Sequence, residues 1–243
     1  MNGWLSKIWH WLLKAAMWFF GITFIWVLIY RFVPVPYTIL MFQRCVEQKW
    51  NSTEVRLQKD WVPLDKISNH LQLAVVCSED QRFLWHHGFD FEAMKEAMEY
   101  NQKQKAKKKK RVRGASTITQ QTAKNAFLFP TRSYLRKGLE VYFTLLIELL
   151  WNKERIMEVY LNVIEFGDGI YGAEAAAQHF FKKSCYKLTT AEAARLAAVL
   201  PAPLRFNAGK PSGYVLSRQA HIQTQMMLWG GSLDYDMQPV EEK

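Results

Sequence analysis

The chain has 243 residues, which leaves room for a short membrane segment and one compact domain of roughly 200 residues, but not for a second large domain. Its cysteines, Cys45, Cys77 and Cys185, lie far apart and are odd in number, which argues against a metal-binding cysteine cluster and excludes complete pairing within the chain. The net charge of +10 at pH 7 indicates an anionic partner, which could be nucleic acid, anionic lipid headgroups or a phosphorylated substrate.

An uncharged apolar segment, residues 15–30, lies near the N-terminus, and apolar residues within 8–13 extend it. A membrane helix needs about 20 mostly apolar residues, and Lys14 can reach the headgroup region from near the end of such a span. Arg31 and the stiff residues 34–36 follow, in place of a small-residue cleavage site, so we expect a retained anchor and not a removed signal peptide. A buried core helix is the alternative.

Charges around the apolar segment predict its orientation. Lys7 and Lys14 precede the segment and Arg31 follows it closely, which is a slight bias towards a cytoplasmic N-terminus. We therefore expect residues 1–36 to form the cytoplasmic tip, the anchor and a connector. Residues 37–243 are expected to form one catalytic domain outside the cytoplasm.

The segment after the anchor is predicted to be mainly α-helical. Residues 35–42 are expected to be an extended connector. Asp90 is placed to cap a helix whose buried face would hold Phe91, Met94 and Met98. Apolar spacing predicts further helices at residues 64–78, 135–150, 153–162, 172–181 and 191–200.

A basic insert occupies residues 103–113, from Lys103 to Arg113. A run of like charges repels itself, so we expect a solvated, mobile loop. The run lacks the interleaved aromatic residues that stack on bases, so no nucleic-acid partner is expected.

Two adjacent carboxylates end the first predicted helix of the domain. Glu79 and Asp80 follow an apolar run and precede Phe83 and Trp85. Successive helical residues point about 100° apart, so only one of the two carboxylates can face a pocket. A carboxylate among apolar neighbours suits general acid–base catalysis, whereas a surface ion pair is the alternative.

A polar segment follows the basic insert. Thr117 can cap a helix together with Gln120, and these two residues would form one polar stripe with Gln121 and Lys124. Amide groups and a cation on one helix face suit sugar hydroxyls and a phosphate. A merely solvated helix face is the alternative.

Three cations precede a carboxylate farther along. Arg132, Arg136 and Lys137 come before Glu140, and the last two cations share a helix face with it. An exposed pair of this kind contributes only about 0.3 kcal/mol to stability, so stability alone does not explain the cluster. Binding of a pyrophosphate would explain it.

At these residues the chain resembles the peptidoglycan glycosyltransferases, glycosyltransferase family 51, the lysozyme-like domains of bifunctional penicillin-binding proteins and of monofunctional transglycosylases. Five family motifs are matched in order over residues 45–205. The first two are matched by Glu79, Asp80, Phe83, His86 and Gly88, and by Gly114, Ser116 to Gln121, Lys124 and Asn125. The last three are matched by Arg136, Lys137 and Glu140, by Lys153, Ile156, Glu158, Tyr160, Leu161 and Asn162, and by Gly172, Ala175, Ala176, Phe181 and Lys183.

The resemblance implies a mainly α, lysozyme-like, two-lobed domain after one transmembrane helix. Since the chain ends without a penicillin-binding domain, the expected type is the monofunctional, biosynthetic one. The chain departs from the family's usual sequence at Met157 and Lys182 and in the basic insert, none of which touches the two key glutamates.

The implied activity is transfer of a growing glycan chain, held on undecaprenyl pyrophosphate, to the sugar 4-hydroxyl of lipid II, giving a β-1,4 linkage with inversion. Glu79 would be the general base. The implied cations for the pyrophosphate are Lys124, Arg132, Arg136 and Lys137. The implied location is the inner membrane with the domain in the periplasm, and the expected partners are lipid II, the lipid-linked glycan and cell-wall synthesis proteins.

The remaining roles also follow from the resemblance. Glu140 would orient the cations or help to hold a divalent metal, which is expected to be Mg²⁺. Ser116 and Gln121 would contact sugar or phosphate, whereas His86 and Gly114 would be structural. A lysozyme-like glycan hydrolase and a non-catalytic membrane scaffold are the competing hypotheses.

Overall fold

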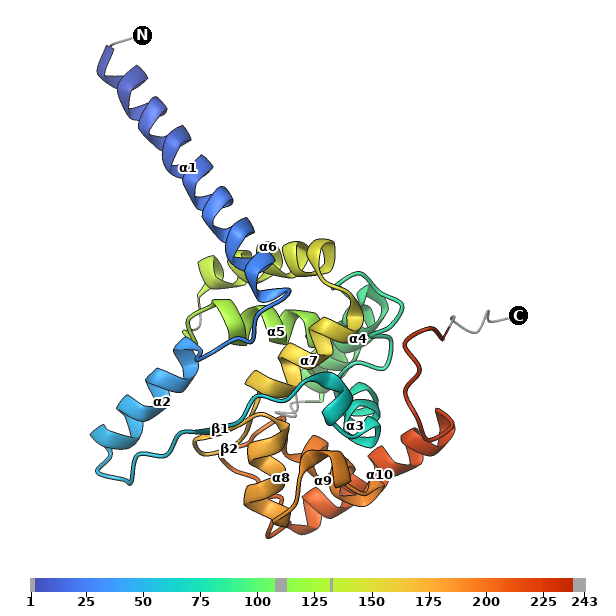
Figure 1. The fold of residues 1–243 in the computed structure, drawn as a ribbon. Helices are drawn as coiled ribbons and strands as arrows, with labels where there is room; N and C mark the ends of the chain where they lie inside the picture. The colour runs from blue at the N-terminus through green and yellow to red at the C-terminus, as the bar shows by residue number, and fades with distance from the viewer. Residues whose placement is uncertain (1–2, 108–112, 132, 238–243) are drawn as a thin grey trace.

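The structure is a computed structural model that describes residues 3–107, 113–131 and 133–237 (Figure 1). It is mainly α-helical, as predicted. In chain order its elements are α1 (Gly3–Tyr30), α2 (Ile39–Trp50), β1 (Gln58–Lys59), the 3₁₀ turn η1 (Leu64–Lys66), α3 (Asn69–Glu79), α4 (Phe91–Ala106), α5 (Ile118–Phe127), α6 (Tyr134–Leu150), α7 (Lys153–Val163), β2 (Glu165–Gly167), β3 (Ile170–Tyr171), α8 (Ala173–Phe181), the 3₁₀ turn η2 (Cys185–Lys187), α9 (Thr190–Val199) and α10 (Gly213–Leu228).

Helix starts follow from capping side chains. At several helices the residue before the first turn accepts a hydrogen bond from a backbone N–H of that turn, which satisfies a donor that the helix itself leaves free. The capping residues are Asp90, Thr117, Ser133, Asn152, Thr189 and Ser212. The predicted caps at Asp90 and Thr117 are therefore confirmed, and the last four predicted helices agree with α6 to α9 at nearly every boundary.

Helix α1 projects from the rest of the molecule (Figure 1). Its segment Trp4–Tyr30 has the length and hydropathy of a membrane span. Within this segment, only 11% of the most apolar 18-residue window is buried inside the protein. A core helix would be covered by its own protein, so the core-helix alternative does not fit. The predicted transmembrane helix has the expected form.

The last turns of α1 pack on α6, which crosses near the base of α1 in Figure 1. The hydroxyls of Thr23 and Tyr142 are 2.7 Å apart and share a hydrogen bond. Trp26 packs edge-on against Phe127 of α5, with ring centroids 5.2 Å apart. The indole Nε1 of Trp151 donates to the Val27 carbonyl at 2.9 Å. The C-terminal part of α1 is thus packed against the rest of the protein.

The predicted extended connector at residues 35–42 is partly wrong, because α2 already begins at Ile39 after Thr38. The buried residues of α2 are Met41 and Gln48. Its other side exposes further apolar side chains, namely Phe42, Val46 and Trp50. Apolar residues on both sides hide the one-sided periodicity that would predict a helix from sequence.

Helix α4 differs from its prediction in two ways. Phe91, Met94 and Met98 are exposed by 74%, 37% and 62%, and Ala97 is the buried residue of this helix, so the predicted buried face is wrong. The basic insert is also partly helical, because α4 continues to Ala106 and the amide of Asn101 exchanges two hydrogen bonds with the Arg113 backbone. Residues 108–112 of the insert lie outside the described residues.

The remaining helices form two groups. Helices α3, α9 and α10 pack together, and α5 packs against α6 and α7. A small sheet of strand order β1-β3-β2, with β1 parallel and β2 antiparallel to β3, contacts α8. The two groups agree with the expected two-lobed fold. Helix α3 ends at Glu79, beside the helices of the second group.

Candidate active site

Glu79 is the last residue of α3, and its side chain is 14% exposed. Its Oε1 accepts a hydrogen bond from Ser78 Oγ at 3.0 Å and lies 3.4 Å from Nη2 of Arg218 on α10. Its Oε2 accepts from Nε2 of Gln121 on α5 at 3.1 Å. Donors from both helix groups therefore meet at this one carboxylate.

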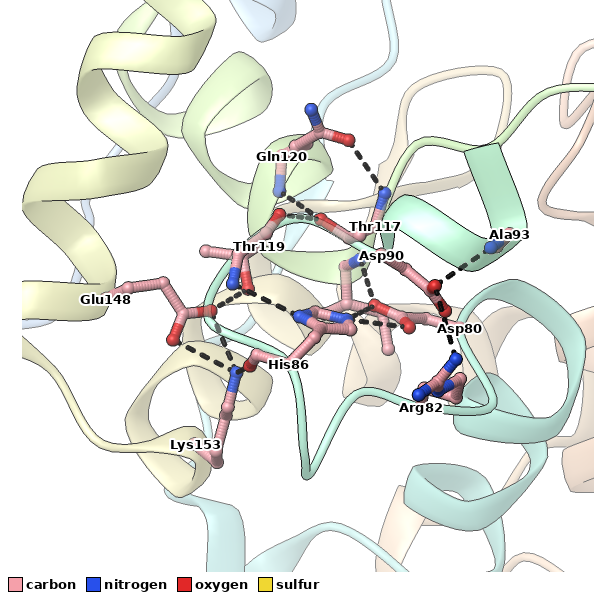
Figure 2. A network of polar contacts seen from close by, with 12 residues as sticks. Asp80, Arg82, His86, Asp90, Ala93, Thr117, Thr119, Gln120, Glu148 and Lys153 are labelled. Carbon is pink, nitrogen blue, oxygen red and sulfur yellow. Dashed lines mark hydrogen bonds and ion pairs between the residues drawn. The ribbon is translucent and has the colours of Figure 1, made fainter. Parts of the chain in front are cut away.

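Asp80, the residue after the end of α3, faces a different environment from Glu79, as predicted. It is buried, and both of its carboxylate oxygens lie 2.9 Å from Nε2 of His86 (Figure 2). It also accepts from the backbone N–H of Ile118, in the first turn of α5, at 2.9 Å. Since Nδ1 of His86 accepts from Gly88 N, the proton on the ring is assigned to Nε2. These contacts place His86 in the loop after Glu79, and its structural role stays a prediction.

Gly88 is required by the shape of this loop. Its φ is +86°, and a Cβ added there would lie 2.7 Å from Cγ2 of Thr144 on α6. Its carbonyl accepts from the Thr117 hydroxyl at 2.7 Å. Gly114 contrasts with it, because a Cβ added there would meet no atom of the described residues within 4 Å. The structure gives no steric reason for a glycine at position 114.

A second polar network fixes the same loop from the other side (Figure 2). The Lys153 ammonium donates to the His86 carbonyl at 2.6 Å and to both carboxylate oxygens of Glu148, at 2.9 and 3.0 Å. Glu148 also accepts from the Thr119 hydroxyl at 2.6 Å. The loop that follows Glu79 is therefore tied to α5, α6 and α7 together.

Only two of the four residues in the predicted polar stripe on α5 remain available to the site. Thr117 and Gln120 are buried and bond to each other in a capping box, so they are not available to a substrate. Gln121 and Lys124 are half-buried and remain facing the site. Gln121 is itself held, because its Oε1 accepts from the Tyr160 hydroxyl at 3.3 Å.

Lys124 lies within electrostatic reach of both glutamates. Burial lowers the pKa of Lys124 below the ordinary lysine value. Glu140 and Glu79 act in the opposite direction, whereas the positive charges of Arg136 and Lys137 lower this pKa further. Lys124 therefore connects the Glu79 end of the site with the charge cluster on α6.

That cluster forms around Glu140, which is only 4% exposed. Arg136 Nη1 donates to its Oε2 at 2.9 Å and Lys137 Nζ to its Oε1 at 2.5 Å. The Arg136 Nε is buried and has no partner among the residues that the structure describes. The predicted neighbours Arg136, Lys137 and Glu140 are thus brought together, with one more positive than negative charge.

Two predicted residues stand apart from this arrangement. Ser116 lies one residue before the Thr117 cap of α5 and is exposed. Its contact with sugar or phosphate stays a prediction. Arg132 lies outside the described residues.

A resident metal does not fit the groups around Glu140. Across residues 3–107, 113–131 and 133–237, no three His, Cys, Asp or Glu side chains gather in a way that could hold a metal ion. Both oxygens of Glu140 already pair with cations. Magnesium prefers six oxygen ligands, and one paired carboxylate does not provide them. The dependence of the activity on Mg²⁺ stays a prediction.

Sequence reasoning missed Arg218 entirely. The buried residues of α10, at Val215, Gln219, Ile222 and Met226, have helical spacing that could have predicted this helix. Nothing local, however, connects Arg218 to Glu79, because the two are 139 residues apart in the chain.

Comparison with known proteins shows which family the chain belongs to. A sequence model of the family described as "Transglycosylase" matches residues 47–227. The chain is 55% identical to the "Biosynthetic peptidoglycan transglycosylase" of Bdellovibrio bacteriovorus, over 87% of this chain and 83% of that protein. Proteins of the same name from Yersinia pseudotuberculosis and Bacteroides thetaiotaomicron are 50% and 51% identical, over 93% and 92% of this chain and 93% and 88% of their own lengths. The chain therefore belongs to the transglycosylase family.

Proposed function

We propose that this protein is a membrane-anchored peptidoglycan glycosyltransferase that polymerises lipid II into β-1,4-linked glycan strands and releases undecaprenyl pyrophosphate. The observation that carries the proposal is the placement of Glu79, a held but partly exposed carboxylate, near a cluster of cations on α5 and α6. The names of the relatives, which this chain matches over most of its length, support the same activity.

In the proposed reaction Glu79 accepts the proton of the acceptor 4-hydroxyl. The acceptor oxygen forms a bond to the anomeric carbon of the donor while the bond from that carbon to the pyrophosphate oxygen breaks. The electron pair leaves with the pyrophosphate, on the face opposite to attack, so the α-linked donor gives a β-linked product. A positioned general base typically contributes about a hundred- to ten-thousandfold to the rate.

The cations Lys124, Arg136 and Lys137 stabilise the negative charge that grows on the departing pyrophosphate, and Arg132 is the further predicted contributor. Preorganised charges of this kind are often the largest catalytic contribution. Glu140 holds Arg136 and Lys137 in place through its two oxygens. A divalent cation, Mg²⁺, is proposed only as a counterion to the pyrophosphate oxygens.

The charge cluster also separates this proposal from the alternatives. A lysozyme-like hydrolase cleaves a sugar–sugar bond and releases no pyrophosphate, so it has little use for cations beside its glutamate. A non-catalytic scaffold does not explain why donors from three helices hold one carboxylate. Neither alternative accounts for both features.

The proposed location is the inner membrane, with the domain on the periplasmic side. Helix α1 supplies the anchor. Beside it, the outer face of α6 exposes an apolar stripe formed by Tyr134, Leu135, Val141, Leu145 and Leu149. A stripe next to a membrane span suits contact with lipid. The periplasmic side rests on the charge bias around α1, and partners in cell-wall synthesis stay a prediction.

Polymerisation of labelled lipid II by the full-length protein tests the proposal. We expect long glycan from the wild type, and a loss of about a thousandfold for Glu79→Gln, which keeps the size of the side chain but removes its basicity. Parallel reactions with and without Mg²⁺ test the metal. A folded wild type that makes no glycan, or that shortens glycan already present, would refute the proposal.

A further inference from the structure

We infer that Arg218 on α10 is a positioning residue that holds the Glu79 carboxylate in its reactive orientation. The inference rests on the proposed role of Glu79 as general base. It adds a residue from the C-terminal helix, beyond the five sequence motifs, to the machinery of the reaction.

The first observation is the cluster of contacts at the end of α3. Nη2 of Arg218 donates to Ser78 Oγ at 2.9 Å and lies 3.4 Å from both the Ser78 carbonyl and Glu79 Oε1. The Ser78 hydroxyl in turn donates to the same Glu79 Oε1 at 3.0 Å. One guanidinium group therefore holds Glu79 both directly and through the serine hydroxyl.

The second observation is how the two oxygens of Glu79 are divided. Oε1 is held from the α10 side by Arg218 and Ser78, and Oε2 is held from the α5 side by Gln121 at 3.1 Å. A carboxylate with hydrogen bonds to both of its oxygens has little freedom to rotate. Without Arg218 the Ser78 hydroxyl could turn to other acceptors, such as the Ala197 carbonyl that already lies 3.4 Å away.

The third observation is that Arg218 comes from a firmly packed helix. Helix α10 packs against α3 and α9 and buries Val215, Ile222 and Met226. Gln219, next to Arg218, accepts from Arg195 of α9 at 2.9 Å. The guanidinium also lies at the C-terminal end of α3, where free carbonyl groups favour a cation.

The contacts favour positioning over substrate binding. Nη2 is engaged inside the protein, and Nε is buried without a partner among the described residues. The side chain is only 27% exposed. Its positive charge lies next to a carboxylate that has to be ionised before it can accept a proton.

The test measures lipid II polymerisation by full-length Arg218→Met and Arg218→Lys. We expect Arg218→Met to lower kcat about tenfold with little change in KM, because a misplaced base weakens the transition state and not the binding of substrate. Arg218→Lys keeps the charge and should recover part of kcat. Arg195→Met is the matched control, because it removes another arginine contact to α10 without touching Glu79.

The decisive comparison adds Arg218→Met to Glu79→Gln under single-turnover conditions with enzyme in excess. If Arg218 acts through the base, the second substitution costs nothing further once the base is gone. An equal loss in both backgrounds, a raised KM with unchanged kcat, or a wild-type kcat in Arg218→Met would each overturn the inference. Thermal melting of each variant separates these results from misfolding, and an inactive wild type would refute the proposed function instead.

Discussion

At the residue scale, the charge on Lys124 is the feature with the clearest consequence for pH. Burial lowers its pKa, so Lys124 loses its proton at a lower pH than an ordinary lysine does. The neutral amine cannot stabilise a departing pyrophosphate, so activity should fall as the pH rises through this lowered pKa. The alkaline limit of the reaction is therefore expected below the ordinary lysine range.

Lys124→Arg tests this assignment, because an arginine keeps its charge to a pH of about 12 or more. We expect kcat/KM of the variant to persist to higher pH than that of the wild type, even if its maximum is lower. The measurement is a pH profile of lipid II polymerisation between neutral pH and the alkaline limit of protein stability. An alkaline limit that does not move would show that another group sets it.

The residue scale is also where sequence reasoning succeeded and failed for identifiable reasons. The neighbourhoods of Glu79, Gln121, Lys124 and Glu140 could be inferred from helical spacing and family resemblance, because each contact partner predicted for them lies within a few residues or in a matched motif. Thr117 and Gln120 were placed on the right helix, but their role in the cap took them out of the site. Arg218 could not be found, because its meeting with Glu79 depends on how α10 packs.

At the element scale, the loop between α3 and α4 holds the site together through Gly88. Gly88→Ala would force a Cβ to within 2.7 Å of the Thr144 methyl group at a φ of +86°. We expect a loss of about 1–3 kcal/mol in the free energy of unfolding. Gly114→Ala is the matched control, with a change within about 0.5 kcal/mol, because its surroundings are open. Chemical denaturation of both variants checks this, and equal stabilities would contradict it.

Element boundaries were predictable where one face of a helix is apolar and a cap precedes it, as in α6, α7 and α9. They were not predictable where that contrast is absent. Helix α2 is apolar on both sides, and α4 exposes the apolar residues that its spacing predicts to be buried. In both cases the exposed apolar surface follows from the position of the helix in the molecule, which local periodicity does not contain.

At the scale of the whole molecule, the α6 stripe and α1 predict which face of the domain meets the bilayer. A fluorophore attached at Leu145→Cys should be quenched by brominated lipid in nanodiscs that hold the full-length protein. A fluorophore at Tyr186→Cys, which is also exposed but lies at η2, should be quenched much less. Cys45→Ser is needed in both variants, because Cys45 is half-buried whereas burial raises the pKa of Cys77 to about 12 and keeps that thiol unreactive.

Equal quenching at the two positions would contradict the predicted orientation. Strong quenching at Leu145 alone would support a domain that rests on lipid through α6 and directs η2 away from it.

The contact between α1 and α6 has a further consequence for how substrate is found. Tyr142 meets α1 at Thr23, seven residues before its end at Tyr30, a distance of about 10 Å along the helix. Arg155 then fixes the chain that leaves α1, by donating to the Tyr30 and Val33 carbonyls. These contacts fix the orientation of the domain relative to α1. With α1 in the membrane as proposed, the encounter with a lipid-linked substrate becomes a search in two dimensions, at a fixed distance from the bilayer.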